Sequence, residues 1–198
     1  GRVNFHNISR TDLGISYSPE VRMDVFHDQM SNSESNTYVN VPLQKSIGET
    51  FAVDLALTAN LSRYKPENKS AVANNYFLFS PSVLYKKPTV SIQAGIRPSW
   101  DNSEFKLLPN VMAEFNSNDK RFAFQLGWIG SLRNSGFQYQ AGMNPWIIPP
   151  DMVFNTRIEE RYAGFKGSVG DHLSYSAKIA SNKLYNQPLF SNDTISGK

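Results

Sequence analysis

The chain lacks cysteine altogether and has only three histidines in its 198 residues. Without cysteine, neither disulfide bonds nor thiolate ligands can hold the fold together. His6, His27 and His172 are far apart in the sequence, and none stands in a spacing such as His-Glu-x-x-His. Because a zinc site needs three or four converging ligands, the sequence predicts no metal site and no cofactor.

Long apolar runs are also missing, since no segment approaches the roughly 18 apolar residues of a membrane-spanning helix. The 20 basic and 17 acidic residues are scattered singly, so no nucleic-acid surface is expected. No Gly-x-Ser-x-Gly elbow is present, and Gly164, Gly167 and Gly170 lack the Lys-Ser/Thr ending of a phosphate loop. We therefore expect a protein that is not an enzyme.

What the sequence does contain is alternation between apolar and polar residues from about residue 50 to residue 132. In the first clean run every second residue is apolar: Phe51, Val53, Leu55, Leu57 and Leu61. A later run places Val90, Ile92, Ala94, Ile96 and Trp100 on one side. A period of two is typical of a strand with two different faces, whereas a helix would repeat every 3.6 residues.

The breaks in this alternation predict about ten strands, at residues 12–17, 21–28, 37–45, 50–63, 75–86, 89–100, 105–116, 120–132, 156–168 and 172–183. Tight turns rich in Gly, Pro, Asn and Asp are expected at 18–20, 46–49, 87–88, 117–119 and 169–171. Longer polar loops are expected at 29–36, 64–74, 101–104 and 133–155. Short and long connections therefore alternate, as they do in outer-membrane barrels.

The predicted fold is all-β, an antiparallel up-and-down meander that forms an outer-membrane β-barrel or part of one. Several predicted strands run to about 12 residues, which suits a tilted strand that crosses a bilayer better than a typical soluble strand. Pro81, Pro98 and Pro109 lie inside predicted strands, where they remove donors from the ladder. We expect the whole of residues 1–198 to be one segment of a longer barrel.

Aromatic residues make up 13% of the chain, a proportion that suits strands and interfacial girdles. Tyr85, Trp100, Phe105, Trp128 and Tyr162 are expected at or near strand ends. Tyr and Trp prefer the membrane–water interface, where the ring is apolar and its tip is wet. The aromatics are therefore predicted to form a girdle that faces lipid, although the core of a sandwich would also use them.

The predicted loop at 133–155 is apolar and stiff, with Trp146 and Phe154 among its large side chains. It either folds over the barrel mouth as a constriction or docks on a partner or ligand. Arg157, Glu159 and Arg161 follow it at strand spacing, so they share one face, predicted to be the polar lumen side. These five residues are the candidates for ligand or loop contact.

Residues 76–190 resemble the C-terminal barrels of TonB-dependent receptors. The resemblance rests on strand-and-turn blocks at 79–87, 91–95, 105–111, 142–146 and 155–170, with 188–190 continuing the last one. It implies a piece of barrel wall in the bacterial outer membrane. Nothing in the sequence resembles the plug domain or energy-coupling box of that family, and no binding residue is carried over.

The leading hypothesis is an outer-membrane β-barrel segment of a transporter or receptor, which acts by ligand passage or binding rather than by catalysis. Its expected partners are outer-membrane lipid, an envelope protein or a small ligand, and further copies of the chain through open sheet edges. The alternative is a soluble extracellular β-sandwich binding module, which would bury the same alternating face in a core.

Overall fold

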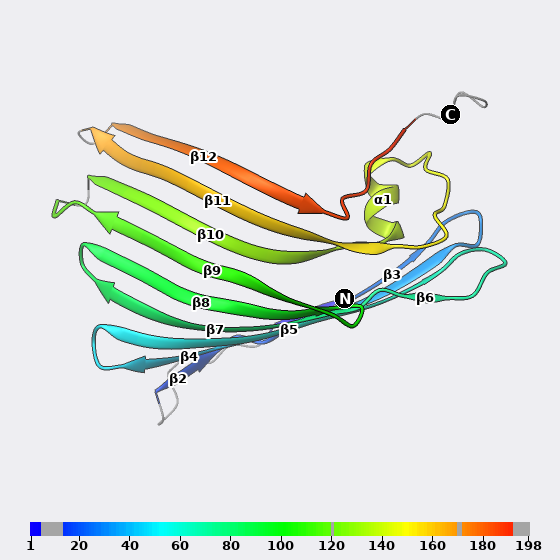
Figure 1. Cartoon of the computed structure of the whole chain (residues 1–198), viewed down its shortest axis with the longest axis horizontal. Coiled ribbons are helices and arrows are strands. Elements are labelled where there is room, and N and C mark those ends of the chain that lie inside the picture. Colours follow the sequence, from blue (N-terminus) through cyan, green and yellow to red (C-terminus); the bar gives the residue numbers. More distant parts are fainter. Residues whose placement is uncertain (5–13, 120, 170–171, 192–198) are drawn as a thin grey trace.

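The computed structural model describes residues 1–4, 14–119, 121–169 and 172–191. All of its strands belong to one antiparallel sheet that does not close, which confirms the predicted all-β meander as a partial barrel (Figure 1). The strands are β1 (Arg2–Asn4), β2 (Ile15–Tyr17), β3 (Glu20–His27), β4 (Ser33–Ile47), β5 (Phe51–Lys65), β6 (Val72–Ala73), β7 (Tyr76–Lys87), β8 (Val90–Asp101), β9 (Glu104–Asn116), β10 (Phe122–Ser135), β11 (Phe154–Val169) and β12 (Leu173–Tyr185).

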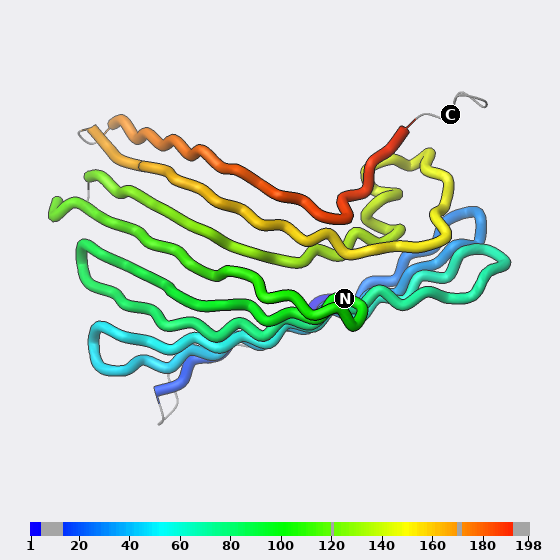
Figure 2. Tube along the Cα trace, in the orientation of Figure 1, coloured from blue at the N-terminus to red at the C-terminus, as the bar shows by residue number. Residues whose placement is uncertain are grey.

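The path through the sheet is β1-β3-β4-β5-β7-β8-β9-β10-β11-β12, with β2 attached to β4 and β6 attached to β5. Figure 2 follows the chain through successive hairpins, with turns at one end of the sheet and loops at the other. The helix α1 (Phe137–Met143) lies at the loop end, between β10 and β11 (Figure 1). Turn end and loop end are used below in this sense.

The predicted turn at 18–20 is wrong, because β2 and β3 do not form a hairpin with each other. Both pair with β4 in one register, Tyr17 opposite Leu43 and Glu20 opposite Asn40, so they lie end to end along it. Pro19 lies in the gap between them, and it has no N–H to donate to the ladder. The two predicted strands are therefore one interrupted strand.

The predicted long loop at 101–104 is also wrong. β8 ends at Asp101 and β9 begins at Glu104, so only Asn102 and Ser103 connect them. Their φ angles of 47° and 77° are both positive, as in the type I′ turns that close two-residue hairpins. Longer connections remain at 28–32, 66–75 and 136–153, and short turns at 48–50 and 88–89. Part of the predicted strand 12–17 and of the predicted turn 169–171 falls on residues outside the described ranges.

One face of the sheet is apolar across its whole width. A single row of ladder partners runs from Val53 through Val83, Ala94 and Val111 to Trp128. We call this side of the sheet the apolar face and the opposite side the concave face. Among the described residues no second sheet or helix covers the apolar face at these strands, and Trp128 is 44% exposed.

The apolar band is staggered relative to the ladder. On β5 it extends from Phe51 up to Leu61, ten residues towards the loop end. Ladder pairing connects Phe51 through the intervening strands to Ile179 on β12. On β12 the apolar band extends from Ile179 in the opposite direction, six residues towards the turn end, to Leu173. Over the six strand steps from β5 to β12 the band therefore shifts by about 1 to 1.7 residues per strand. Such a stagger is what tilted strands of a barrel produce.

Aromatic rings pair at both ends of the apolar face. Phe51 and Tyr85 lie 5.2 Å apart, centroid to centroid, near the turn end, and Trp100 and Phe105 lie 5.4 Å apart near the loop end. The prediction for two other aromatics is wrong, since Trp128 lies in the middle of β10 and Tyr162 in the middle of β11.

Prolines weaken the ladder in the middle of the sheet. β7 and β8 pair from Tyr76 to Leu78 and again from Ser82 to Lys87, and the gap coincides with Pro81 and Pro98. Both lack the N–H that the ladder requires at that point. The predicted loss of ladder donors is therefore confirmed at these two positions.

Beyond this region the loop ends of β10 and β11 fold across the concave face. The exposure of alternate side chains on β10 falls from 44% at Trp128 to 8% at Leu132, which packs with Leu78 and Leu108. In the same region, Asn155 of β11 donates a hydrogen bond of 2.7 Å to Asp101 of β8. The sheet thus doubles over itself at the loop end.

The helix α1 was not predicted, and it lies within the apolar loop expected at 133–155. Phe137 is 2% exposed and packs against Tyr64 and Phe26, at centroid distances of 5.2 and 5.6 Å. Val153, at the end of the same connection, is 3% exposed and belongs to the same cluster. The connection therefore folds back onto the concave face.

Candidate functional site on the concave face

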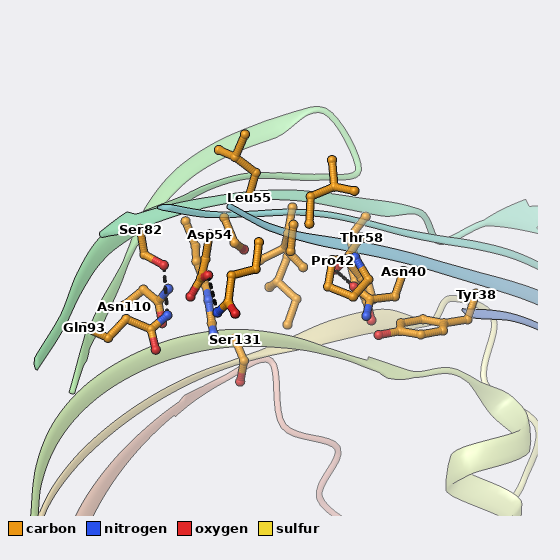
Figure 3. Close-up of a pocket in the computed structure, with 18 residues that line it drawn as sticks. Tyr38, Asn40, Pro42, Asp54, Leu55, Thr58, Ser82, Gln93, Asn110 and Ser131 are labelled. Atoms are coloured by element: carbon orange, nitrogen blue, oxygen red, sulfur yellow. Dashed lines mark hydrogen bonds between the residues drawn. The ribbon is translucent and has the colours of Figure 1, made fainter. Parts of the chain in front are cut away.

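The concave face carries mainly polar side chains in the middle of the sheet, because neighbouring residues of a strand point to opposite sides. A cavity of about 460 Å³ lies between the middle of the sheet and the folded-over part of β10. Figure 3 shows Asp54, Thr58 and Ser82 pointing into it, Leu55 on the other side of the sheet, and Ser131 across the cavity.

Neutral amide and hydroxyl groups dominate this cavity and bond to one another. Gln93 donates to Ser82 at 2.9 Å, and Thr58 donates to Asn40 at 2.9 Å. These short bonds run between adjacent strands, so they hold each side chain at a fixed place on the face.

Asp54 and Arg97 are the two charged side chains of the cavity wall. Asp54 accepts a hydrogen bond of 2.8 Å from Gln44, and Arg97 donates one of 2.8 Å to the carbonyl of Gly130. The Arg97 bond spans β9 and ties β8 to β10. It therefore fixes the distance between the two walls of the cavity.

A second cavity of about 630 Å³ lies further towards the loop end, beneath α1. The carboxylate of Glu34, 2% exposed, accepts hydrogen bonds from the Ser62 hydroxyl at 2.8 Å and from the Gln138 backbone N–H at 2.7 Å. Glu34 thus anchors the first turn of α1 to β4 and β5.

Three buried amide oxygens on the walls of these cavities accept no hydrogen bond from the described part of the chain. They belong to Asn36, Asn60 and Asn110. A buried polar group without a partner costs free energy, so such groups offer acceptors to whatever enters. Sequence alternation places these residues on the polar face, but it does not single them out.

The cavity walls offer mainly groups that form hydrogen bonds. Among the described residues no cluster of three or more His, Asp or Glu side chains is close enough to hold a metal ion. The charged groups of the wall are engaged in structural hydrogen bonds, and the remaining groups are amides and hydroxyls. Such a surface can form many neutral hydrogen bonds to a polar ligand.

The five sequence-predicted contact residues do not form one site. Trp146 is 85% exposed in the connection after α1, and Phe154 is 51% exposed at the start of β11. No hydrogen bond or ring contact within the described residues links either of them to Arg157, Glu159 or Arg161.

The predicted lumen position is wrong for Arg161. Arg161 pairs with Trp128 across the ladder, and its guanidinium carbon lies 4.9 Å from the Trp128 ring centroid. Phe165 and Val169 have the same parity as Arg161, so the sequence contained the signal that shows which face Arg161 occupies. Arg157 and Glu159 are at even spacing from Arg161, but they pair with Leu132 and Gly130, where β10 folds across the concave face.

Comparison with known proteins finds no matching family model, no matching curated protein and no matching solved structure. No helix among the described residues is long and apolar enough to cross a membrane.

Proposed function

We propose that the chain is part of the wall of a bacterial outer-membrane β-barrel, and that its concave face binds or passes a small polar ligand without catalysis. The observation that carries the proposal is the uncovered apolar band and its stagger across the sheet. In a barrel the strands lie about 4.8 Å apart and tilt by about 35–45° from the barrel axis. A line parallel to the membrane plane therefore crosses each successive strand at a position shifted by roughly 1 to 1.5 residues. The shift of about 1 to 1.7 residues per strand in this sheet overlaps that range.

The height of the band supports the same proposal. On β9 the outward apolar residues extend from Phe105 to Phe115, which corresponds to about 23 Å along the normal for a strand tilted by about 45°. Outer-membrane barrels carry an apolar band about 25 Å tall between two aromatic girdles. The pairs Phe51–Tyr85 and Trp100–Phe105 stand where such girdles are expected.

The concave face then corresponds to the lumen. Its amides and hydroxyls suit a neutral polar ligand, and the connection that contains α1 narrows the loop end. The more specific proposal, a barrel of the TonB-dependent type, rests on the strand-and-turn resemblance of residues 76–190 alone. Exposed Trp146 and Ile148, at 85% and 73%, favour contact of the same connection with an envelope protein or ligand as a second candidate role.

Lipid also constrains the sheet edge. β12 pairs with β11 on one side, and among the described residues nothing pairs with its other side. In hydrocarbon every backbone N–H and C=O needs a partner, so we expect further strands of a barrel, or another copy of the chain, to pair with β12.

Detergent dependence tests the proposal against the soluble sandwich. The full chain should regain its strand content by circular dichroism in detergent micelles or in phospholipid vesicles, and should aggregate in buffer alone. A monodisperse, folded protein without detergent would support the sandwich module instead, because such a protein has to cover the apolar band with its own residues.

A further inference from the structure

Two tyrosines and an asparagine form one row across the concave face. Asn60 of β5 pairs with Tyr38 of β4 on one side and with Tyr76 of β7 on the other. Residues directly opposite each other in a ladder project from the same face, with their Cβ atoms about 5 Å apart. The row therefore places a side-chain amide between two phenol rings. Below, Tyr38, Asn60 and Tyr76 are called the central row.

The central row lies where the two cavities of the concave face meet. Tyr38 and Tyr76 line both cavities, as does Leu132 of the folded-over β10. Figure 3 shows Tyr38 at one end of the first cavity, beyond Thr58 and Asn40. The volumes of about 460 and 630 Å³ each fall within the roughly 300–1,000 Å³ of ligand pockets. An elongated ligand that occupies both cavities would therefore pass over the central row.

The polar groups of this row have no hydrogen-bond partner from the described part of the chain. Tyr76 is 5% exposed and Asn60 is 2% exposed, yet neither side chain forms a hydrogen bond there, and nor does the Tyr38 hydroxyl. Buried tyrosine hydroxyls usually have a partner, and a buried polar group without one costs free energy. The central row therefore has unused donors and acceptors at the junction of the cavities.

The charges on the cavity walls cancel. Among the described residues that line them, each cavity has as many cationic as anionic side chains: Arg97 with Asp54 in the first, and Arg22 and Arg133 with Asp24 and Glu34 in the second. The Nε atom of Arg22 lies 3.4 Å from Oδ2 of Asp24, and the same guanidinium lies over the Tyr38 ring at 5.0 Å. A ligand that matches walls without net charge is itself neutral.

Sugar rings have the chemistry that this row lacks. A sugar hydroxyl donates and accepts through one oxygen, so it can bond both to an amide and to a neighbouring phenol hydroxyl. The C–H groups of a sugar ring can pack against a tyrosine ring, whose face is slightly negative. A peptide backbone donates and accepts through separate atoms, so it matches an amide between two phenols less closely.

We propose that the ligand of the concave face is a neutral oligosaccharide, and that the central row holds one of its sugar rings at the junction of the two cavities. The proposal rests on the proposed function, because it names the ligand class for the same lumen-facing surface. The amide of Asn60 and the hydroxyl of Tyr76 bond to the sugar, and the Tyr38 ring packs against it.

Saturation-transfer NMR on the full chain in deuterated detergent micelles tests the ligand class. The probes are maltotriose, cellotriose, xylotriose and N-acetylchitotriose, with trialanine capped at both ends as the peptide probe. Ring protons of at least one saccharide should receive saturation from the protein, and the capped peptide should not. Because the saccharides are uncharged, the affinity from a titration should be the same at low and at high salt.

Conservative variants of the central row test the site. Tyr76→Phe removes only a hydroxyl and should weaken saccharide binding roughly two- to tenfold, as expected for one lost hydrogen bond. Asn60→Leu removes the whole amide at similar size and should weaken binding at least as much. Tyr85→Phe is the matched control, because it removes a hydroxyl from the apolar face of the same strand and should leave the affinity unchanged. Circular dichroism should show the same strand content for all three variants.

The possible failures are distinguishable. Unchanged saccharide affinity in Tyr76→Phe and Asn60→Leu would overturn the central row as the site. Saturation of the capped peptide alone would replace the saccharide with a peptide ligand, and saturation of no probe would overturn the saccharide class. None of these results touches the membrane proposal, which fails only if the full chain is folded and monodisperse without detergent.

Discussion

The carboxylate of Glu34 accepts a hydrogen bond of 2.7 Å from the backbone N–H of Gln138, 104 residues further along the chain. This contact places α1 against β4 and β5, and it does so without a helix-capping side chain, since Gly136 at the N-cap supplies none. The buried carboxylate therefore holds the connection between β10 and β11 against β4 and β5.

Glu34→Ala should release α1 from the sheet. The Ser62 hydroxyl and the Gln138 N–H would lose a buried acceptor, which costs about 1–3 kcal/mol for each group left unpaired. Amide hydrogen exchange at residues 137–143 should accelerate while exchange in β7–β9 stays slow. Glu104→Ala, at an exposed position, is the control. Unchanged protection of α1 would contradict the anchoring role.

Gly95→Ala should destabilise the sheet by at least about 1–3 kcal/mol. A Cβ at residue 95 would lie 2.4 Å from the backbone oxygen of Pro81, which cannot rotate away. Gly142→Ala is the matched comparison, because a Cβ there meets nothing within 4 Å and alanine favours a helix. Denaturant unfolding in micelles should lower the midpoint for the first variant and not for the second.

A charge should be tolerated on one face of β9 and not on the other. Val111→Arg places a cation in the middle of the apolar band and should cost about 2–4 kcal/mol in vesicles. Met112→Arg, the next residue, points to the concave face and should cost much less. Equal losses of unfolding free energy for the two variants would mean that both faces meet a similar environment.

Acid should loosen the turn between β9 and β10. Hydrogen bonds from the Ser117 hydroxyl and the Arg121 backbone N–H hold the pKa of the Asp119 carboxyl below its usual value. A lowered pKa means that the stabilisation is present above the unfolded value of about 3.9 and is lost as the pH falls through the folded value. Exchange of the Arg121 amide should rise in that window, and Asp119→Asn should remove the pH dependence.

The sequence predicted the strands best where alternation was uninterrupted. From Phe51 to Leu61 the alternation predicts correctly which side chains share a face of the sheet. A period of two is a local property of the strand, so it can be seen in the sequence. The turn predicted at Ser18–Glu20 is wrong because a proline such as Pro19 is compatible both with a reversal of the chain and with a break in a strand that continues in the same direction. Local sequence does not distinguish these two outcomes.

Other features depend on contacts between distant residues. α1 has seven residues and no side-chain cap, so little local signal marks it, and Glu34 and Tyr64 hold it from the other half of the chain. The cavities on the concave face likewise form because β10 folds over β8, a contact between strands that are not neighbours in the sheet. Periodicity reports which face a residue occupies, but not what folds over that face.

The depth of each tryptophan in a bilayer tests the central claim most directly. In single-tryptophan variants reconstituted in vesicles, brominated acyl chains should quench Trp128 and Trp100, with Trp128 deeper, and should leave the 85% exposed Trp146 unquenched. That pattern would place the apolar face of the sheet in hydrocarbon. Full emission from Trp128 in every brominated vesicle would contradict the account, because that side chain lies in the row that joins the apolar residues of five strands.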